Sequence, residues 1–207
     1  MKQLFEKHSI TNFRISAYDG KIMDSYTDVD FKTDRSVYEM GCTLSHFKAI
    51  KSLYESKVKI GIIMEDDLRL DFIDKWDKSL HEIIRDAPLD WEIIKLHCGY
   101  AKHIKKLIKR SNKMEFSPWE PRSTSTGCYI INDRGMKNLI DKYWKNDKWT
   151  IHHNLPVADN ILYVNVMTYD YTKPTFTHVI RDSTIHNEYL DSHKEALCCI
   201  QNYYSNI

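Results

Sequence analysis

The chain has 207 residues, enough for one domain with a sizeable hydrophobic core. Its 30 Lys and Arg residues nearly balance its 29 Asp and Glu residues, and the formal net charge of +1 argues against nucleic acid or an anionic membrane as the main partner. No apolar stretch approaches the roughly 20 residues that a membrane span needs. The charged segment at residues 1–8 also lacks the apolar region of a signal peptide, so we expect a cytoplasmic protein.

The first half of the chain predicts a strand, a helix and a second strand. Residues 13–17 alternate in polarity and lead into Asp19-Gly20, which is typical of a strand that ends in a turn. Residues 39–56 carry an apolar stripe at helical spacing, and this stripe includes Cys42 and His46. The apolar run at residues 60–64 predicts a buried, parallel strand.

The second half continues the alternation of helices and strands. We expect a helix over residues 72–84, a buried strand at 93–96, and a long surface loop at 100–126. A strand at 129–131 then leads into a helix that carries Met136, Leu139, Ile140 and Tyr143 on one side, and residues 162–167 have the pattern of a last strand. This order predicts an α/β fold with a parallel or mixed sheet.

The five cysteines are scattered and do not show the spacing of a zinc site. Their odd number and the expected compartment both favour reduced thiols. They are Cys42, Cys98, Cys128, Cys198 and Cys199.

Three consecutive carboxylates, Glu65-Asp66-Asp67, follow the strand at residues 60–64. Ligands of open α/β sheets bind at the carboxyl ends of the strands. Two carboxylates about 5 Å apart repel each other by roughly 3 kcal/mol at an effective dielectric constant near 20. A bound cation would relieve this repulsion, but acids after a strand also serve as helix caps or lie in solvated turns.

Six short patterns then follow one another in an order that resembles glycosyltransferase family 25. This family includes lipooligosaccharide and collagen galactosyltransferases and proteins of large DNA viruses, so a host cell's cytoplasm is a further expected location. The patterns are Ala17-Tyr18-Asp19-Gly20, Gly41-Cys42-Thr43-Leu44-Ser45-His46, Met64-Glu65-Asp66-Asp67, Ser125-Thr126-Gly127-Cys128-Tyr129-Ile130, Pro156-Val157-Ala158-Asp159 and Ser183-Thr184-Ile185.

The resemblance implies a GT-A-like fold, a mixed sheet flanked by helices, in a single domain over residues 1–207. Family members usually open with a further strand, and we expect this sequence to lack it, since residues 1–5 resemble the helix that would follow it. Without that strand the sheet would lose a central member and leave backbone groups unpaired, and another segment or a neighbouring subunit would fill the gap. We therefore expect a homo-oligomer built by edge pairing.

The resemblance also implies that Glu65 and Asp67 face Mn²⁺ or Mg²⁺ on the diphosphate of a UDP-sugar donor. A hard cation with oxygen ligands neutralises the charge that develops on the leaving diphosphate. Asp66, on the opposite side of a strand, would instead orient the neighbouring backbone.

Further candidates follow from the same resemblance, each with a structural alternative. Ser45 and His46 match the family's Leu-Ser-His and would shape the donor pocket, although His46 also fits a histidine of the core. Asp19 would lie near the base and ribose, or only close a turn. Ser183 would bind a phosphate, and His186 would be a late metal ligand or a surface histidine.

An inverting transfer needs a base within hydrogen-bonding reach of the acceptor hydroxyl. Asp159 is the candidate, with Asp67 as the second catalytic residue, although Asp159 also fits a helix N-cap. The basic run at residues 102–110 would attract an anionic ligand or form a solvated face.

These observations predict a metal-dependent transferase that moves galactose or glucose from a UDP-sugar to a glycan or a hydroxylysine-bearing protein. The alternative is a catalytically silent GT-A-like domain that serves in binding or assembly. A phosphoryl or nucleotidyl transferase is a weaker alternative, because the six glycines form no phosphate-binding loop.

Overall fold

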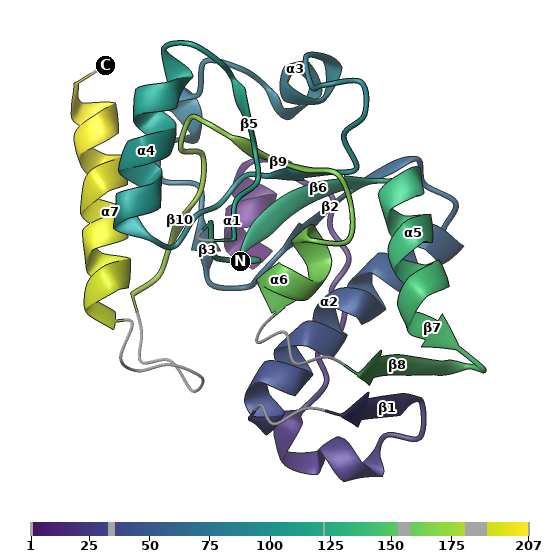
Figure 1. The fold of residues 1–207 in the computed structure, drawn as a ribbon. Helices are drawn as coiled ribbons and strands as arrows, with labels where there is room; N and C mark the ends of the chain where they lie inside the picture. The colour runs from purple at the N-terminus through teal and green to yellow at the C-terminus, as the bar shows by residue number, and fades with distance from the viewer. Residues whose placement is uncertain (1, 33–35, 122, 153–157, 181–189, 207) are drawn as a thin grey trace.

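The computed structural model describes residues 2–32, 36–121, 123–152, 158–180 and 190–206. Its centre is a five-stranded sheet in the order β2-β6-β4-β9-β5 (Figure 1). β4 and β9 are parallel and the other neighbouring strands are antiparallel, so the sheet is mixed, as predicted. The strands are β2 (Ile60–Met64), β6 (Cys128–Asn132), β4 (Ile93–Lys95), β9 (Thr168–Tyr171) and β5 (Phe116–Pro118).

Two smaller sheets and the helices complete the described fold. One small sheet has the order β1-β8-β7, and the other pairs β10 with β3. Their strands are β1 (Val29–Lys32), β8 (Lys148–His152), β7 (Trp144–Lys145), β10 (Thr177–His178) and β3 (Leu68–Arg69). The helices are α1 (Lys2–Lys7), η1 (Gly20–Ser25), α2 (Val37–Glu55), η2 (Ile73–Lys75), α3 (Leu80–Arg85), α4 (Ala101–Ser111), α5 (Asp133–Tyr143), α6 (Ala158–Tyr163) and α7 (Leu190–Ser205).

The central sheet is covered on both faces because side chains alternate along its strands. On β6, Tyr129 and Ile131 belong to a core that includes residues of α2, α5 and α6. Cys128 and Ile130 belong to a second core, which includes Ile83 of α3. A third core joins α4 to α7, which lie side by side at one end of the molecule (Figure 1). None of the helices described is both long and apolar enough to cross a bilayer.

Several predicted elements are confirmed. The helix expected over residues 39–56 is α2, whose start is fixed by a reciprocal cap between Ser36 and Glu39. The strands expected near residues 93–96 and 129–131 are β4 and β6, and the helix after β6 is α5.

In the first third of the chain one prediction is wrong and a second is confirmed only in part. Residues 13–17 form no strand and pair with no other strand described, and Phe13 is 88% exposed, so the alternation there does not mark a buried face. The run at 60–64 is a strand, β2, but it is antiparallel to β6 and lies at the sheet edge. Because β2 has a neighbour on one side only among the strands described, Ile60 and Ile62 are 40% and 38% exposed.

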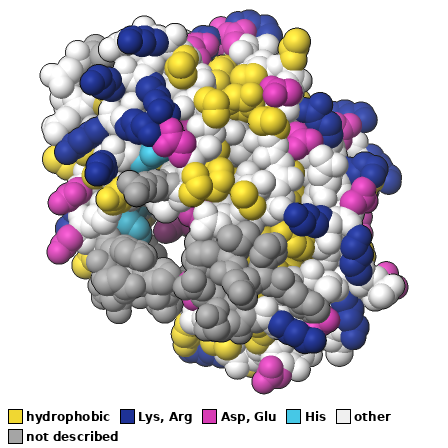
Figure 2. All heavy atoms as spheres, in the orientation of Figure 1, with side chains coloured by type: hydrophobic (Ala, Val, Ile, Leu, Met, Phe, Trp, Pro, Cys, Tyr) yellow, Lys and Arg dark blue, Asp and Glu magenta, His cyan; other side chains and the backbone are white. Residues whose placement is uncertain are grey.

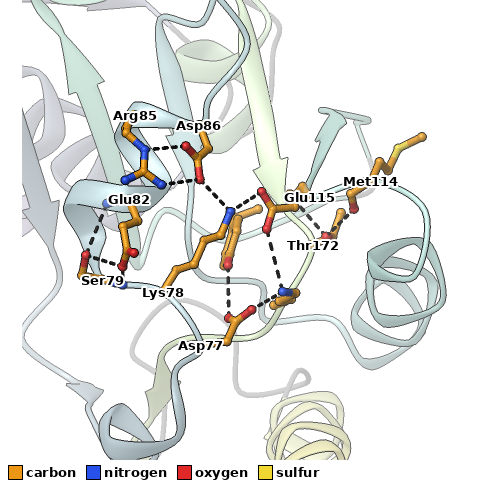
Figure 3. A network of polar contacts seen from close by, with 11 residues as sticks. Asp77, Lys78, Ser79, Glu82, Arg85, Asp86, Met114, Glu115 and Thr172 are labelled. Carbon is orange, nitrogen blue, oxygen red and sulfur yellow. Dashed lines mark hydrogen bonds and ion pairs between the residues drawn. The ribbon is translucent and has the colours of Figure 1, made fainter.

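The helix predicted over residues 72–84 is interrupted. It consists of the short η2 and the separate α3, whose start is fixed by Ser79 and Glu82 in a reciprocal cap (Figure 3). Lys78, just before this cap, donates to Asp86 at 2.8 Å and to Glu115 at 2.6 Å. The contact with Glu115 holds the chain between η2 and α3 beside the segment before β5.

Two further predictions are wrong because each segment contains helical residues that were expected to form a loop or a strand. The loop expected over 100–126 contains the helix α4, whose Ala101, Ile104 and Leu107 are buried at spacings of three residues. The last strand expected over 162–167 is instead the end of α6 and a turn, and the strand β9 begins at Thr168.

Candidate active site

The three consecutive acids lie where β2 ends. β2, β4 and β9 run in the same direction, because β2 and β4 are both antiparallel to β6, and β4 is parallel to β9. Their carboxyl ends therefore share one edge of the sheet, the edge at which open α/β sheets bind ligands. Figure 2 shows a hollow on this side of the molecule, between α7 and α6, with histidine and acidic side chains at its margin.

The three acids differ in their surroundings. The N–H of Glu65 donates to the carbonyl of Gly127 at 2.8 Å, and the Glu65 side chain is 36% exposed. Asp66 and Asp67 are exposed and lie in a turn, so the strand-like alternation that was expected to set Asp66 apart does not apply. The carbonyl of Asp67 accepts from Val179 at 2.8 Å, which fastens this turn to the segment after β10.

His46 supplies the positive partner of Glu65. Its Nε2 lies 3.1 Å from Glu65 Oε1, and its Nδ1 lies 3.2 Å from the hydroxyl of Tyr129. Burial opposes a charge on either side chain, but the contacts with Glu65 and Cys42 raise the pKa of His46, and the contact with His46 lowers the pKa of Glu65. The pair is therefore an imidazolium and a carboxylate at neutral pH. His46 is buried, as in the core alternative, and it also contacts the acidic motif.

The loop before β6 connects Glu65 to Asp159. Thr126 donates from Oγ1 to Glu65 Oε1 at 2.6 Å, and the N–H of Ser125 donates to Asp159 Oδ2 at 2.6 Å. Tyr163 also donates to the carbonyl of Ser125 at 3.1 Å. Asp159 lies in the first turn of α6 and accepts from this distant loop. The two predicted carboxylates are thus joined through two adjacent residues.

Asp19 and Ser45 make backbone contacts. Asp19 caps η1 by accepting from the N–H of Lys21 at 2.9 Å, which is the turn role allowed for it in the sequence analysis. Ser45 accepts from the N–H of Tyr18 at 2.9 Å and donates to the carbonyl of Gly41 at 2.6 Å. Both side chains fasten the segment before η1, and their contact with a nucleotide stays a prediction.

The remaining candidates are distributed differently. Ser183 and His186 lie outside the described residues. The lysines and the arginine of the basic run lie on the outer face of α4, where Lys106 and Arg110 pair with Glu120, whereas His103 is buried beside Asp170. Part of the run's charge is thus neutralised within the chain, which favours the solvated-face interpretation.

Comparison with known families supplies the deciding observation. The model of glycosyltransferase family 25, described as an LPS biosynthesis protein family, matches residues 1–161. This chain belongs to glycosyltransferase family 25. The resemblance inferred from the order of the motifs is thereby confirmed, and the mixed sheet flanked by helices agrees with the GT-A-like fold it implied.

Curated relatives of this family-25 chain include procollagen galactosyltransferases. The chain is 30% identical to procollagen galactosyltransferase 1-A of Xenopus laevis over 141 residues, which is 64% of this chain and 22% of that protein. It is 33% identical to procollagen galactosyltransferase 1-B of the same organism over 129 residues, covering 58% of this chain and 20% of the relative. With procollagen galactosyltransferase 2 of Homo sapiens, identity is 23% over 165 residues, or 73% of this chain and 24% of that protein. The chain thus matches about a quarter or less of each relative's length.

The sequence analysis of this family-25 chain assigned no role to a row of histidines beside the acidic motif. His97 follows β4, and its Nδ1 lies 2.7 Å from Ser125 Oγ, while its Nε2 lies 3.1 Å from Nδ1 of His178 on β10. The ring of His193 on α7 lies 5.0 Å from that of His178. Burial lowers the pKa of His97 to about 3 and that of His178 to about 4, so both rings are neutral. The position of His97 just beyond a predicted strand was the available signal.

A buried ion pair between Lys95 and Asp170 also holds the loop before β6. The side chain of Lys95, at the end of β4, is fully buried, and its Nζ lies 3.6 Å from Asp170 Oδ1 on β9. Lys95 also donates to the carbonyls of Ser123 and Thr124 at 2.5 and 2.9 Å. Ser123 in turn donates to Asp170 at 2.6 Å. Breaking a buried pair of this kind costs about 3–5 kcal/mol, so Lys95 holds the loop firmly.

Proposed function

We propose that this chain transfers a hexose, galactose or glucose, from a UDP-sugar to a glycan or to a hydroxylysine-type protein acceptor, with inversion. Membership of family 25 and the galactosyltransferase relatives support a sugar transfer. The observation that carries the proposal is the link from Glu65 through Thr126 and Ser125 to Asp159 at the carboxyl ends of the strands. It joins a candidate donor site to a candidate base by hydrogen bonds.

Glu65 and Asp67 would hold Mn²⁺ or Mg²⁺. A carboxylate donor set suits these hard cations, and two exposed acids beside a half-buried one leave oxygens accessible to an ion. The bound ion would neutralise charge on the departing diphosphate. One oxygen of Glu65 already accepts from Thr126 and faces His46, so Glu65 would offer its other oxygen to the ion.

Asp159 would take the proton from the acceptor hydroxyl. Its Oδ2 is held by the N–H of Ser125, so the carboxylate has a fixed orientation while Oδ1 makes no hydrogen bond to the residues that the structure describes. A positioned carboxylate within hydrogen-bonding reach of a hydroxyl is the arrangement that general base catalysis requires. Ser125 would act as a positioning residue for this base.

A panel of UDP-sugars with and without Mn²⁺ tests the proposal. We expect Mn²⁺-dependent release of UDP from UDP-galactose or UDP-glucose, and a loss of roughly 100-fold or more in Asp67→Ala, because loss of one electrostatic contact to a developing charge has effects of this size. Asp147→Asn is the matched control, since it removes a carboxylate in the turn between β7 and β8 at a positive φ of 59° that asparagine tolerates.

Two results would contradict the proposal. An undiminished rate in Asp67→Ala would remove Asp67 from the donor site. Folded protein that turns over no UDP-sugar and shows no Mn²⁺-dependent thermal shift with UDP would favour the alternative, a silent GT-A-like domain that serves in binding or assembly.

A further inference from the structure

Cys42, His46 and Glu65 form a cluster that the scattered spacing of the cysteines did not suggest. Cys42 and His46 are four residues apart on α2 and therefore lie on the same face of the helix. One ligand atom from each of the three residues lies within 4.8 Å of the other two. Among the residues that the structure describes, no other group of His, Cys, Asp and Glu side chains meets these distances.

The distances suit a single small cation. Ligand atoms around a tetrahedral zinc ion lie roughly 3.3–3.8 Å apart, so these side chains would need to move by only about 1 Å to close on an ion. Cys42 is partly exposed, His46 is buried and Glu65 is half-buried, so an ion has access from one side and a fixed imidazole on the other.

The donor set favours a soft or borderline cation over Mn²⁺ or Mg²⁺. Thiolate and imidazole ligands bind Zn²⁺ and Cd²⁺, whereas Mg²⁺ prefers oxygen ligands alone. A metal-bound histidine usually donates a hydrogen bond from its other ring nitrogen, which fixes the orientation of the ring. With Nε2 turned to Glu65 and the ion, the Nδ1–H of His46 would donate to the hydroxyl of Tyr129, 3.2 Å away.

A cysteine nucleophile is the competing interpretation of the same residues. In such a site, one ring nitrogen of histidine faces the thiol and the other faces the carboxylate. Here Nε2 lies 3.1 Å from Glu65 and Nδ1 lies 3.2 Å from the Tyr129 hydroxyl, so at either nitrogen the contact of the ring with Cys42 is shared with another partner. The geometry thus suits ligation better than nucleophilic catalysis.

We propose that Cys42, His46 and Glu65 form a binding site for a soft divalent cation such as Zn²⁺, distinct in its ligands from the Mn²⁺ or Mg²⁺ site of the proposed transferase. Binding releases one proton from the Cys42 thiol and one from His46 Nε2 to solvent, and water fills the fourth position. Because Glu65 belongs to both sites, a soft cation competes for it and inhibits sugar transfer.

Cadmium titration followed by the ultraviolet thiolate-to-metal charge-transfer band tests the site without any sugar substrate. The experiment uses the C198S/C199S variant, which removes two adjacent thiols of α7, one exposed and one partly buried, that would add their own signal. Loss of a residue that only hydrogen-bonds to a metal ligand costs about 10–100-fold in metal affinity. Cys42 would be a direct ligand, so we expect Cys42→Ser in this background to weaken Cd²⁺ binding by at least about tenfold and to abolish the band.

A second measurement needs no change at the cluster. In the C198S/C199S protein, Zn²⁺ should slow alkylation of Cys42 by iodoacetamide, as read by mass spectrometry. A band that persists unchanged in Cys42→Ser, or alkylation of Cys42 at the same rate with and without Zn²⁺, would overturn the proposal. Neither result depends on sugar transfer, so this proposal and the proposed function fail separately.

Discussion

The neutral, buried His97 predicts a marked loss of stability in mild acid. The pKa of His97 is lowered by burial from 6.5 to about 3 in the folded chain. Below pH 6.5 the unfolded chain therefore binds a proton that the folded chain does not. Stability is complete above pH 6.5, and it falls progressively as the pH drops from 6.5 toward 3.

The size of the effect follows from these two pKa values. Between pH 7 and pH 5 the unfolded state gains about 2 kcal/mol from protonation of one such histidine, while the folded state gains almost nothing. His97→Gln removes this titration and keeps an amide that accepts from Ser125, 2.7 Å from His97 Nδ1. The free energy of unfolding lost between pH 7 and pH 5 should therefore be about 2 kcal/mol smaller in His97→Gln than in the unmodified chain.

Urea denaturation at pH 7, 6 and 5, followed by far-ultraviolet circular dichroism, measures this difference. His81→Gln is the matched control, because it removes an exposed imidazole on α3 and should leave the pH dependence unchanged. An equal loss of stability in His97→Gln and in the unmodified chain would show that His97 does not stay neutral in the folded protein.

Three further comparisons between variants test the packing around the site by urea denaturation. Gly20→Ala places a Cβ 2.4 Å from the carbonyl oxygen of Val37 and should destabilise the chain by about 1–3 kcal/mol. In Gly99→Ala the nearest atom among the described residues is 3.6 Å from the new Cβ, so this variant should be nearly neutral. Ser125→Ala loses the contacts of Oγ with His97 and Gly127. Ser125→Gly loses the same contacts, but it should lower the free energy of unfolding by about 1 kcal/mol less than Ser125→Ala, because glycine adopts the φ of 94° without strain. Lys95→Met leaves Asp170 buried without its cation and should cost about 3–5 kcal/mol, of which Lys95→Met/Asp170→Asn recovers a part.

Local sequence signals identified the elements that have strong start signals and regular spacing. Ser36 and Glu39 fix the start of α2, and the apolar runs of β4 and β6 are short, buried and well bounded. The same signals failed where partners distant in sequence decide the structure. Residues 13–17 alternate as a strand does but pair with no strand described, and α4 has a basic composition that concealed its buried face.

The sequence predicted the charged residues of the candidate site but not the hydrogen bonds that join them. The motif Glu65-Asp66-Asp67 and its place at a strand end follow from the sequence. The hydrogen bond from Ser125 to Asp159 and the contact of His97 with Ser125 join residues 34 and 28 positions apart, and no local pattern encodes such contacts. The homo-oligomer expected from edge pairing stays a prediction, and β2 lies at an edge of its sheet among the strands described.

The acidic motif was expected to bind a cation that relieves its charge repulsion. In the structure, the imidazolium of His46 places a positive charge beside Glu65. His46 lies 3.1 Å from Glu65, where the gross attraction between unit charges is about 5 kcal/mol at an effective dielectric constant of 20, larger than the roughly 3 kcal/mol repulsion between carboxylates 5 Å apart. Asp66 and Asp67 are exposed, so water screens much of their repulsion. With no nucleotide and no soft cation present, replacing Mn²⁺ by EDTA should therefore lower the melting temperature by no more than about 1 °C, because His46 already supplies the counter-charge of Glu65. In His46→Gln, by contrast, Glu65 loses its counter-charge, and Mn²⁺ should raise the melting temperature relative to EDTA. A fall of several degrees with EDTA in the unmodified chain would mean that the metal, and not His46, holds the acids together.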